Sequence, residues 1–220
     1  MKNIPRIFVG NTVKSGDVLP APRDVSHYLT RVMRRRDFIA FGGGHEFSAN
    51  LSDDGKSFTI GAATPHTDPA NDITLYFAPI KRTDDLINMA TQMGVARIVP
   101  VITERVVAHN LNWDRMRKIA IEASEQSNRN SVPEIAAPVK FTDLNLTDMV
   151  FADERAAYGA KISAAARGAK QIFVGPEGGF SDTEFAALDA GGAHGISLGG
   201  TILRAELAAP IAISRIMELS

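Results

Sequence analysis

An arginine and a glutamate, Arg204 and Glu206, follow one of two glycine-rich segments near the carboxyl end of the sequence. A guanidinium group can stabilise negative charge that develops in a reaction, and a carboxylate can orient that arginine or accept a proton. The other glycine-rich segment, residues 175–179, reads Gly-Pro-Glu-Gly-Gly and carries a further carboxylate, Glu177. Because glycines let a ligand approach backbone N–H groups closely, the two segments together predict a ligand-binding site.

Both glycine-rich segments come directly after short apolar runs, which predict buried strands. The first run covers residues 172–174, and a helix should begin soon after its loop because Ser181 and Glu184 form a capping-box signature. The second run covers residues 196–198 and leads through its loop to a last helix at residues 208–219. The sequence therefore predicts a ligand site at two strand-to-helix turns.

The composition limits the class of protein. The chain has 220 residues, is 45% hydrophobic and contains no cysteine, which excludes a disulfide scaffold and a cysteine-ligated zinc site. Its histidines are too scattered for metal-ligand spacing, so we expect no metal. The amino terminus lacks the apolar core of a signal peptide, and no stretch approaches the length of a membrane-spanning helix. We therefore expect a cytoplasmic protein without a membrane partner.

Several well-known motifs are missing from the sequence. Neither G-x-G-x-x-G nor G-x-x-x-x-G-K-[ST] occurs, which argues against dinucleotide and nucleotide-phosphate sites. The chain also lacks G-x-S-x-G, so nothing supports a hydrolase. A simpler interpretation of the glycines, as residues that only serve turns in an α/β domain, stays open at this point.

The chain is predicted to form two domains that meet at residues 65–72, where two prolines and several turn formers interrupt both flanking patterns. Before this boundary, residues 38–41 and 58–62 predict strands, so residues 1–70 should form a small β-rich domain. After it, apolar runs alternate with helical stretches, which predicts an α/β domain with a parallel sheet in residues 71–220. These expected strands cover residues 73–78, 98–102, 149–152, 172–174 and 196–198.

Positive charge is concentrated in residues 23–36, although the net charge of the chain is −1. Clustered arginines can neutralise phosphates and release counterions, so this basic patch predicts RNA binding that depends strongly on salt. The alternative is a solvated helix face, or ion pairs with Asp24 and Asp37.

Five groups of residues occur in an order that resembles a known family. They are HYLTRVMR at 27–34, ATQMGV with RIVP at 90–100, ER at 104–105, EASEQSNR at 122–129, and GPEGGFSDTE with SLG, ILR and R-x-E at 175–206. Over almost the whole chain this series resembles the bacterial 16S ribosomal RNA uridine-N3 methyltransferases, the ribosomal small subunit methyltransferase E family. Two positions depart from the family pattern: Gln92 stands where glutamate is usual, and Leu207 where threonine is usual.

The resemblance implies a fold and partners. It implies a SPOUT-type parallel sheet with a deep trefoil knot in residues 71–220, preceded by a small PUA-like RNA-binding barrel in residues 1–70. It also implies S-adenosylmethionine as cofactor, 16S rRNA in the small ribosomal subunit as substrate, and a homodimer in which the last helix either forms the interface or packs in the core. Three alternatives stay open: a non-catalytic relative that binds RNA or the ribosome, a methyltransferase for a different RNA, and an enzyme for another nucleotide.

The resemblance further implies which residues form the site. Arg204 would stabilise negative charge on the uracil oxygens while N3 attacks the methyl group, and Glu206 would orient Arg204. The expected cofactor-binding residues come from three loops and are Phe151, Ala152, Val174, Gly175, Pro176, Glu177, Gly178, Gly179, Ser197, Leu198, Gly199, Ile202, Leu203 and Arg204. The expected RNA-binding residues are Arg23, His27, Arg31, Arg34, Arg35 and Arg129, although Arg129 also fits a solvated helix end.

Overall fold

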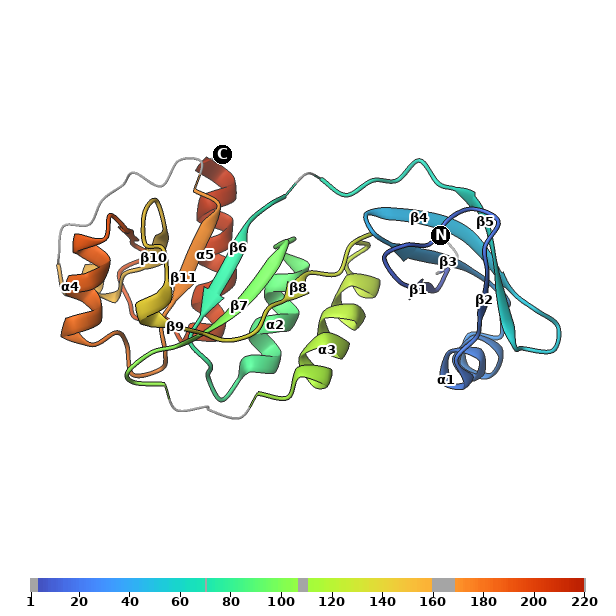
Figure 1. Cartoon of the computed structure of the whole chain (residues 1–220), viewed down its shortest axis with the longest axis horizontal. Coiled ribbons are helices and arrows are strands. Elements are labelled where there is room, and N and C mark those ends of the chain that lie inside the picture. The colour runs from blue at the N-terminus through green and yellow to red at the C-terminus, as the bar shows by residue number, and fades with distance from the viewer. Residues whose placement is uncertain (1–3, 70, 107–110, 160–168, 220) are drawn as a thin grey trace. The chain divides into compact units, whose positions relative to one another are not determined.

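The computed structural model describes residues 4–69, 71–106, 111–159 and 169–219. The chain folds into two units (Figure 1). The first unit consists of Met1–Ala70 together with Ser124–Val132, and the second consists of Asn71–Ala123 and Pro133–Ser220. A single cut in the sequence at residue 70 therefore does not describe the first unit fully, because a later segment returns to it.

The first unit is built on a five-stranded sheet in the order β1-β3-β4-β5-β2. Strand β1 is parallel to β3, and the other pairs are antiparallel. The strands are β1 (Arg6–Phe8), β2 (Val18–Pro20), β3 (Asp37–Gly42), β4 (His45–Leu51) and β5 (Ser57–Ala63). The strands predicted at residues 38–41 and 58–62 are confirmed as β3 and β5. Short helices α1 (Arg23–His27) and η1 (Tyr28–Val32), the latter a π-helix, lie between β2 and β3.

The returning segment is held in the first unit by a buried polar network. The Arg6 guanidinium donates to the Glu46 carboxylate, to the Arg129 carbonyl oxygen at 2.8 Å and to Asn130 Oδ1 at 2.8 Å. The Asn130 N–H donates to Asp68 at 2.7 Å, and the Asn130 side chain is fully buried. Buried polar groups need such partners, so this network fixes the segment rather than merely covering it.

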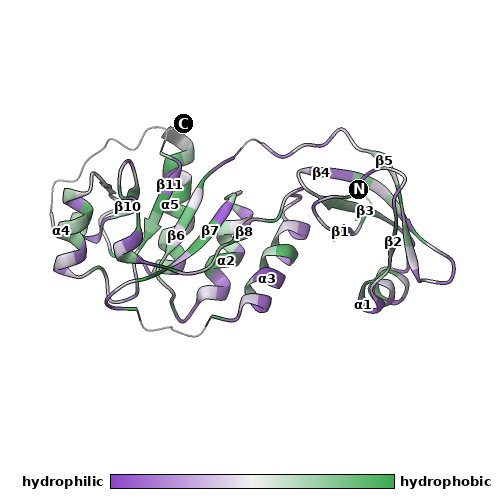
Figure 2. Cartoon of the chain, viewed as in Figure 1, coloured by the Kyte–Doolittle hydropathy of each residue, from purple (hydrophilic) through white to green (hydrophobic). Residues whose placement is uncertain are grey.

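The second unit contains a parallel sheet in the order β12-β10-β11-β6-β7-β8, with β9 also paired to β7. The strands are β6 (Thr74–Phe77), β7 (Arg97–Ile102), β8 (Glu134–Ile135), β9 (Val139–Lys140), β10 (Val150–Ala152), β11 (Gln171–Val174) and β12 (His194–Ile196). The runs predicted at 73–78, 98–102, 149–152 and 172–174 are confirmed as strands β6, β7, β10 and β11. Their apolar colouring in Figure 2 reflects burial of the sheet.

Helices pack onto this sheet and complete the α/β architecture. They are α2 (Thr83–Gln92), α3 (Trp113–Gln126), α4 (Asp182–Ala190) and α5 (Ala205–Leu219), with 3₁₀ turns η2 (Phe141–Asp143) and η3 (Glu154–Tyr158). Phe185 and Leu188 of α4 join a buried cluster with Phe151 and Phe173, and α5 packs against β10, β11 and α2. Among the described residues, no helix is long and apolar enough to cross a membrane.

One predicted strand is placed wrongly. The expected run at residues 196–198 shares only Ile196 with strand β12, which begins at His194. Gly195 pairs with Phe151 of β10, and glycine is needed there because a β-carbon would fall 2.5 Å from Oδ2 of Asp153, which follows β10. Glycine and histidine have low strand propensity. The local sequence pattern therefore placed the predicted strand two residues too late, toward Leu198. The last helix likewise begins at Ala205, earlier than residue 208.

Candidate active site

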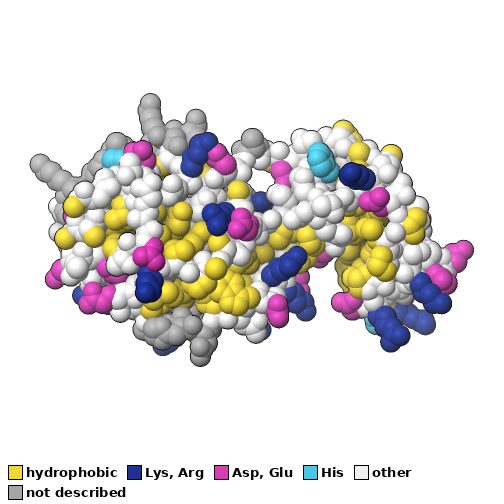
Figure 3. Space-filling model, viewed as in Figure 1, with side chains coloured by type: hydrophobic (Ala, Val, Ile, Leu, Met, Phe, Trp, Pro, Cys, Tyr) yellow, Lys and Arg dark blue, Asp and Glu magenta, His cyan; other side chains and the backbone are white. Residues whose placement is uncertain are grey.

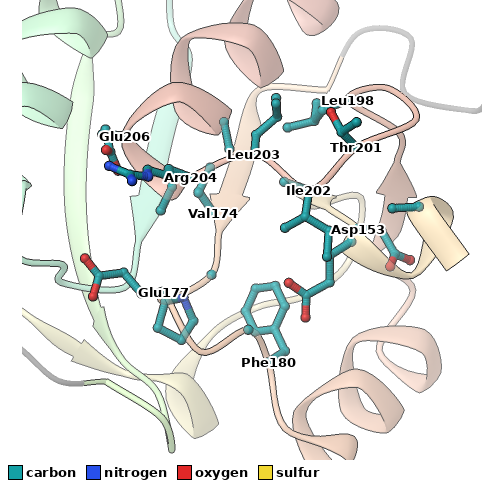
Figure 4. Close-up of a pocket in the computed structure, with 18 of the residues that line it drawn as sticks. Asp153, Val174, Glu177, Phe180, Leu198, Thr201, Ile202, Leu203, Arg204 and Glu206 are labelled. Atoms are coloured by element: carbon teal, nitrogen blue, oxygen red, sulfur yellow. The ribbon is translucent and has the colours of Figure 1, made fainter.

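A cavity of about 510 Å³ lies where the loops after β10, β11 and β12 come together. Ala152, Asp153 and Glu154 line it from the first loop, and the loop after β11 contributes Val174 to Glu177 with Gly179 and Phe180. The loop after β12 contributes Leu198, Gly199 and residues 201–204. Figure 4 shows Glu177, Arg204 and Glu206 on one side, and Asp153, Thr201 and Ile202 on the other. Ligands of parallel α/β sheets bind outside the carboxyl ends of strands, which is where this cavity lies.

The glycine-rich loop after β11 has a defined shape. The predicted capping box is present: the Ser181 hydroxyl accepts the Glu184 N–H at 3.2 Å, and Glu184 accepts the Ser181 N–H at 2.9 Å. The Phe180 ring packs so closely on Gly175 that a β-carbon at Gly175 would lie 3.0 Å from it. Gly179 has φ of +69°, a conformation that favours glycine. The loop is therefore fixed at both ends and lines the cavity with backbone.

Arg204 and Glu206 stand at the start of α5. The Arg204 carbonyl oxygen accepts the N–H groups of Leu207 at 2.9 Å and Ala208 at 2.8 Å, so Arg204 lies just before the first turn of the helix. Arg204 is exposed, whereas Glu206 is buried. The ion pair of Glu206 is formed with Arg82, from Nε to Oε1 at 3.8 Å. Both residues line the cavity, and Arg82 adds a second guanidinium beside the buried carboxylate.

The loop after β10 is tied to helix α4 through Arg155. The Arg155 guanidinium binds both carboxylate oxygens of Asp153 and forms two bonds of 2.9 Å to Asp189. It also lies 4.2 Å from the centre of the Phe185 ring. The hydrogen bond from Arg155 holds the pKa of the Asp189 carboxyl below its usual value, against a smaller opposing effect of burial. Asp153 is therefore engaged in positioning this loop.

Glu154 is the carboxylate of this loop that faces the cavity without a partner. It has no hydrogen bond or ion pair to any residue in the part of the chain that the structure describes, and its side chain is half-buried. Burial, together with the negative charge of Asp153, raises the pKa of Glu154, and Arg105 opposes the rise. A carboxylate that is partly desolvated and unpaired in a cavity can bind a cationic or hydroxyl group of a ligand.

Most of the sequence-predicted site residues lie together at the cavity. Both expected catalytic residues line it, as do Ala152, Val174, Gly175, Pro176, Glu177, Gly179, Leu198, Gly199, Ile202 and Leu203. Phe151, Gly178 and Ser197 do not: Phe151 is buried in the core cluster, and Ser197 and Gly178 are exposed next to lining residues.

Sequence reasoning missed other lining residues, among them Lys81, Arg82, Phe180 and Thr201. Lys81 and Arg82 follow β6, whose carboxyl end lies in the same parallel sheet as that of β11. These two residues could have been predicted from the rule that ligands bind beyond the carboxyl ends of parallel strands.

The expected RNA-binding residues all belong to the first unit. Arg23, His27, Arg31 and Arg34 are exposed on and after α1, and Figure 3 shows dark-blue side chains gathered there. Arg35 instead forms an ion pair with Asp37, one of the alternatives that the sequence left open. Arg129 is partly buried, and burial lowers its pKa against the nearby charge of Asp68.

Across the described ranges, no group of three or more His, Cys, Asp or Glu side chains could hold a metal ion.

Comparison with known proteins assigns the family. Residues 67–217 match the RNA methyltransferase domain family. A protein of Rickettsia conorii named ribosomal RNA small subunit methyltransferase E is 32% identical, over 97% of this chain and 95% of its own length. The chain belongs to the ribosomal RNA small subunit methyltransferase E family. A further family member, from Synechocystis, is 30% identical and covers 88% of this chain and 70% of its own length.

Solved structures share the fold of this methyltransferase family member. The crystal structure of ribosomal RNA small subunit methyltransferase E from Neisseria gonorrhoeae, bound to S-adenosyl methionine, matches 99% of this chain and 98% of its own with a TM-score of 0.84 at 24% identity. A probable rRNA methyltransferase from Porphyromonas gingivalis matches 98% of both chains with a TM-score of 0.81 at 24% identity. The expected α/β fold with a parallel sheet is confirmed.

Proposed function

We propose that this protein transfers a methyl group from S-adenosylmethionine to N3 of a uridine in 16S rRNA of the small ribosomal subunit. The observation that carries this proposal is the convergence of three loops on one cavity, with the glycine-rich backbone, Arg204 and Glu206 all lining it. Family membership supports methyl transfer to ribosomal RNA. The proposed substrate places the activity in the cytoplasm.

The cavity fits the proposed cofactor in size and chemistry. Its volume of about 510 Å³ lies within the range of small-molecule sites. The loop of residues 175–179 offers backbone groups that can bind adenosine and methionine atoms. Glu154 adds a negative side chain that suits a ligand with a cationic amino group and sulfonium. A related structure that contains S-adenosyl methionine has the same fold.

The proposed chemistry needs positioning and charge stabilisation more than a strong base. S-adenosylmethionine supplies an electrophilic methyl group, and the cavity loops hold uridine N3 in line with it. The N3 proton would pass to water, and N3 would form a bond to the methyl carbon as the carbon–sulfur bond breaks and S-adenosylhomocysteine leaves. The Arg204 guanidinium would stabilise the negative charge on the uracil oxygens. Glu206 is buried and paired with Arg82, so it holds the Arg82 guanidinium at this end of the cavity.

The two sequence departures from the family pattern do not weaken this proposal. Gln92 is the last residue of α2, is exposed, and donates a hydrogen bond to Asn88. Leu207 is 47% exposed on α5. Neither side chain lines the cavity. We therefore favour an active enzyme over a non-catalytic relative.

The proposal extends to the architecture implied by the family. Residues 1–70 would act as a PUA-like RNA-binding barrel, and residues 71–220 as a SPOUT methyltransferase domain whose sheet contains a deep trefoil knot. The strand order supports this assignment, because β10 lies between β11 and β12 and all three loops reach one cavity. A homodimer would bury exposed apolar residues of α5, Leu207 and Met217, which are 47% and 43% exposed.

The test is transfer of a radiolabelled methyl group from S-adenosylmethionine to small ribosomal subunits that lack the modification. The modified nucleoside is identified by mass spectrometry and chromatography, and we expect 3-methyluridine. Label in another nucleoside would assign a different position or base. Binding of S-adenosylmethionine without any transfer would instead support the non-catalytic alternative.

A further inference from the structure

Two side chains outside the three cavity loops hold the glycine-rich loop in place. Arg105 lies after β7, and its Nη1 donates to the Gly178 carbonyl oxygen at 3.2 Å and to the Phe180 carbonyl oxygen at 3.1 Å. In the opposite direction, Glu184 Oε1 accepts the N–H of Glu104 at 2.8 Å. The loop after β7 and the loop after β11 are therefore joined by reciprocal, charge-assisted hydrogen bonds.

The Glu184 carboxylate is the centre of this connection. Its other oxygen accepts the Ser181 N–H at 2.9 Å, so one buried carboxylate binds backbone donors of both loops. Ser181 and Glu184 are only 4% and 5% exposed. A capping box explains the bond to Ser181 but not the bond to Glu104, which lies 80 residues away in the sequence.

We propose that Arg105 and Glu184 are positioning residues that hold residues 175–180 in the conformation required to bind the cofactor. This inference rests on the proposed S-adenosylmethionine site. Neither side chain lines the cavity. Both bind the backbone of the loop or of its end, and the charge of Arg105 also acts on Glu154. A loop that is already ordered loses less conformational entropy when it binds a ligand, and the expected effect is therefore on affinity.

The hydrogen-bond geometry at Arg105 also predicts which substitution preserves cofactor affinity. Both bonds come from a single terminal nitrogen, Nη1, so the forked shape of the guanidinium is not required. A lysine ammonium has three donors on one nitrogen and can serve both carbonyl oxygens. Methionine keeps an apolar stem of similar length but has no donor. Cofactor affinity should therefore be preserved when lysine stands at position 105 and reduced when methionine does.

The experiment measures S-adenosylmethionine affinity by isothermal titration calorimetry for the full-length chain and three variants. We expect Arg105→Met to raise the Kd about tenfold, in line with the loss of hydrogen bonds from a charged donor, and Arg105→Lys to stay within about threefold of the unsubstituted chain. The matched control is Arg97→Met, because exposed Arg97 pairs with Glu134 at 3.4 Å and, among the residues that the structure describes, forms no hydrogen bond or ion pair with the glycine-rich loop. This control should leave the Kd unchanged.

Methyl-transfer kinetics distinguish a positioning role of Arg105 from a direct contact with RNA. For Arg105→Met we expect a raised KM for S-adenosylmethionine and a kcat within about threefold of normal at saturating cofactor. An unchanged cofactor Kd would overturn the inference, as would a raised KM for RNA alone, which would make Arg105 an RNA contact. If the unsubstituted chain itself fails to bind S-adenosylmethionine, the proposed function fails and this inference falls with it.

Discussion

The Glu154 carboxyl group lies against the α-carbon of Gly179: a β-carbon at Gly179 would fall 2.1 Å from Glu154 Oε1. Two loops that are distant in the sequence thus meet at the cavity with no space between them for a methyl group. Gly179 also has φ of +69°, so its backbone conformation favours glycine, and a β-carbon there would displace the Glu154 carboxylate.

Gly179→Ala is expected to weaken S-adenosylmethionine binding by roughly 5- to 30-fold. The left-handed backbone costs a non-glycine residue about 1–2 kcal/mol, and the added methyl group displaces the Glu154 carboxylate. Calorimetric titration measures the change. The matched control is Gly16→Ala in the first unit, where φ is also left-handed at +90° but a β-carbon would meet nothing within 4 Å. Equal loss in both variants would contradict this account.

Glu154→Gln is expected to stabilise the cofactor-free protein at neutral pH. Because the pKa of Glu154 is raised above its usual 4.5 in the folded protein, the ionised carboxylate destabilises the fold once the pH rises through the folded pKa. The gain should be present near pH 7 and should vanish as the pH falls below about 4.5, the usual pKa of the carboxyl group. Thermal unfolding at several pH values tests this, with exposed Glu177→Gln as the control. A gain that persists at acid pH would refute it.

Arg204→Ala is expected to reduce methyl transfer by a factor of 100 or more while cofactor Kd changes by less than about tenfold, or about 1.4 kcal/mol. In the proposed mechanism, Arg204 stabilises charge on the base rather than holding the cofactor loop. Single-turnover transfer and calorimetry measure the two effects separately. Arg117→Ala, which removes an exposed arginine on α3, is the control. Parallel loss of transfer and cofactor affinity would make Arg204 a cofactor-binding residue.

Reversal of two exposed arginines, Arg31→Glu with Arg34→Glu, is expected to weaken RNA binding and flatten its salt dependence. Two lost phosphate contacts should reduce the slope of log Kd against log salt by about 1.4–1.8. Arg35 is less suitable for this test because Asp37 already pairs with it. Filter binding at a series of salt concentrations measures the slope, and Lys14→Glu serves as a control outside the patch. An unchanged slope would exclude this patch from the RNA interface.

Glu46→Gln is expected to destabilise the first unit by about 3–5 kcal/mol at pH 7, because it leaves the buried Arg6 guanidinium without its countercharge. Burial tends to raise the pKa of Glu46, but hydrogen bonds from Thr64, Arg6 and His66 outweigh it and hold the pKa below 4.5. The stabilisation is therefore complete above about pH 4.5 and is lost as the pH falls through the lower folded pKa.

Hydrogen exchange of the β3–β5 amides measures the stability of this unit directly. The difference between the Glu46→Gln variant and the unsubstituted chain should shrink as the pH falls below about 4.5. A difference that is constant with pH would show that the Glu46 charge is not responsible.

The local sequence pattern predicted the strands and helices that are specified by a few consecutive residues, such as an apolar run or a capping box. Strands β6, β7, β10 and β11 are short, and each contains buried apolar residues. Ser181 with Glu184 marks the start of α4. The predicted position of strand β12 was displaced because the side chain of Asp153, which follows β10, requires glycine at position 195, and no local pattern records this contact.

The sequence by itself determined the glycine-rich loops, the two charged residues that follow them and the alternation of strands and helices, because these depend on residue type and near-neighbour spacing. Only the tertiary structure decided which loops meet. The strand order β12-β10-β11-β6-β7 places Glu154 against Gly179 and brings Arg82 to Glu206. It also lets Arg105 and Glu184 join the loops after β7 and β11. Each of these contacts links residues from different strand ends, and their distances follow from the order of strands in the sheet rather than from separation along the chain.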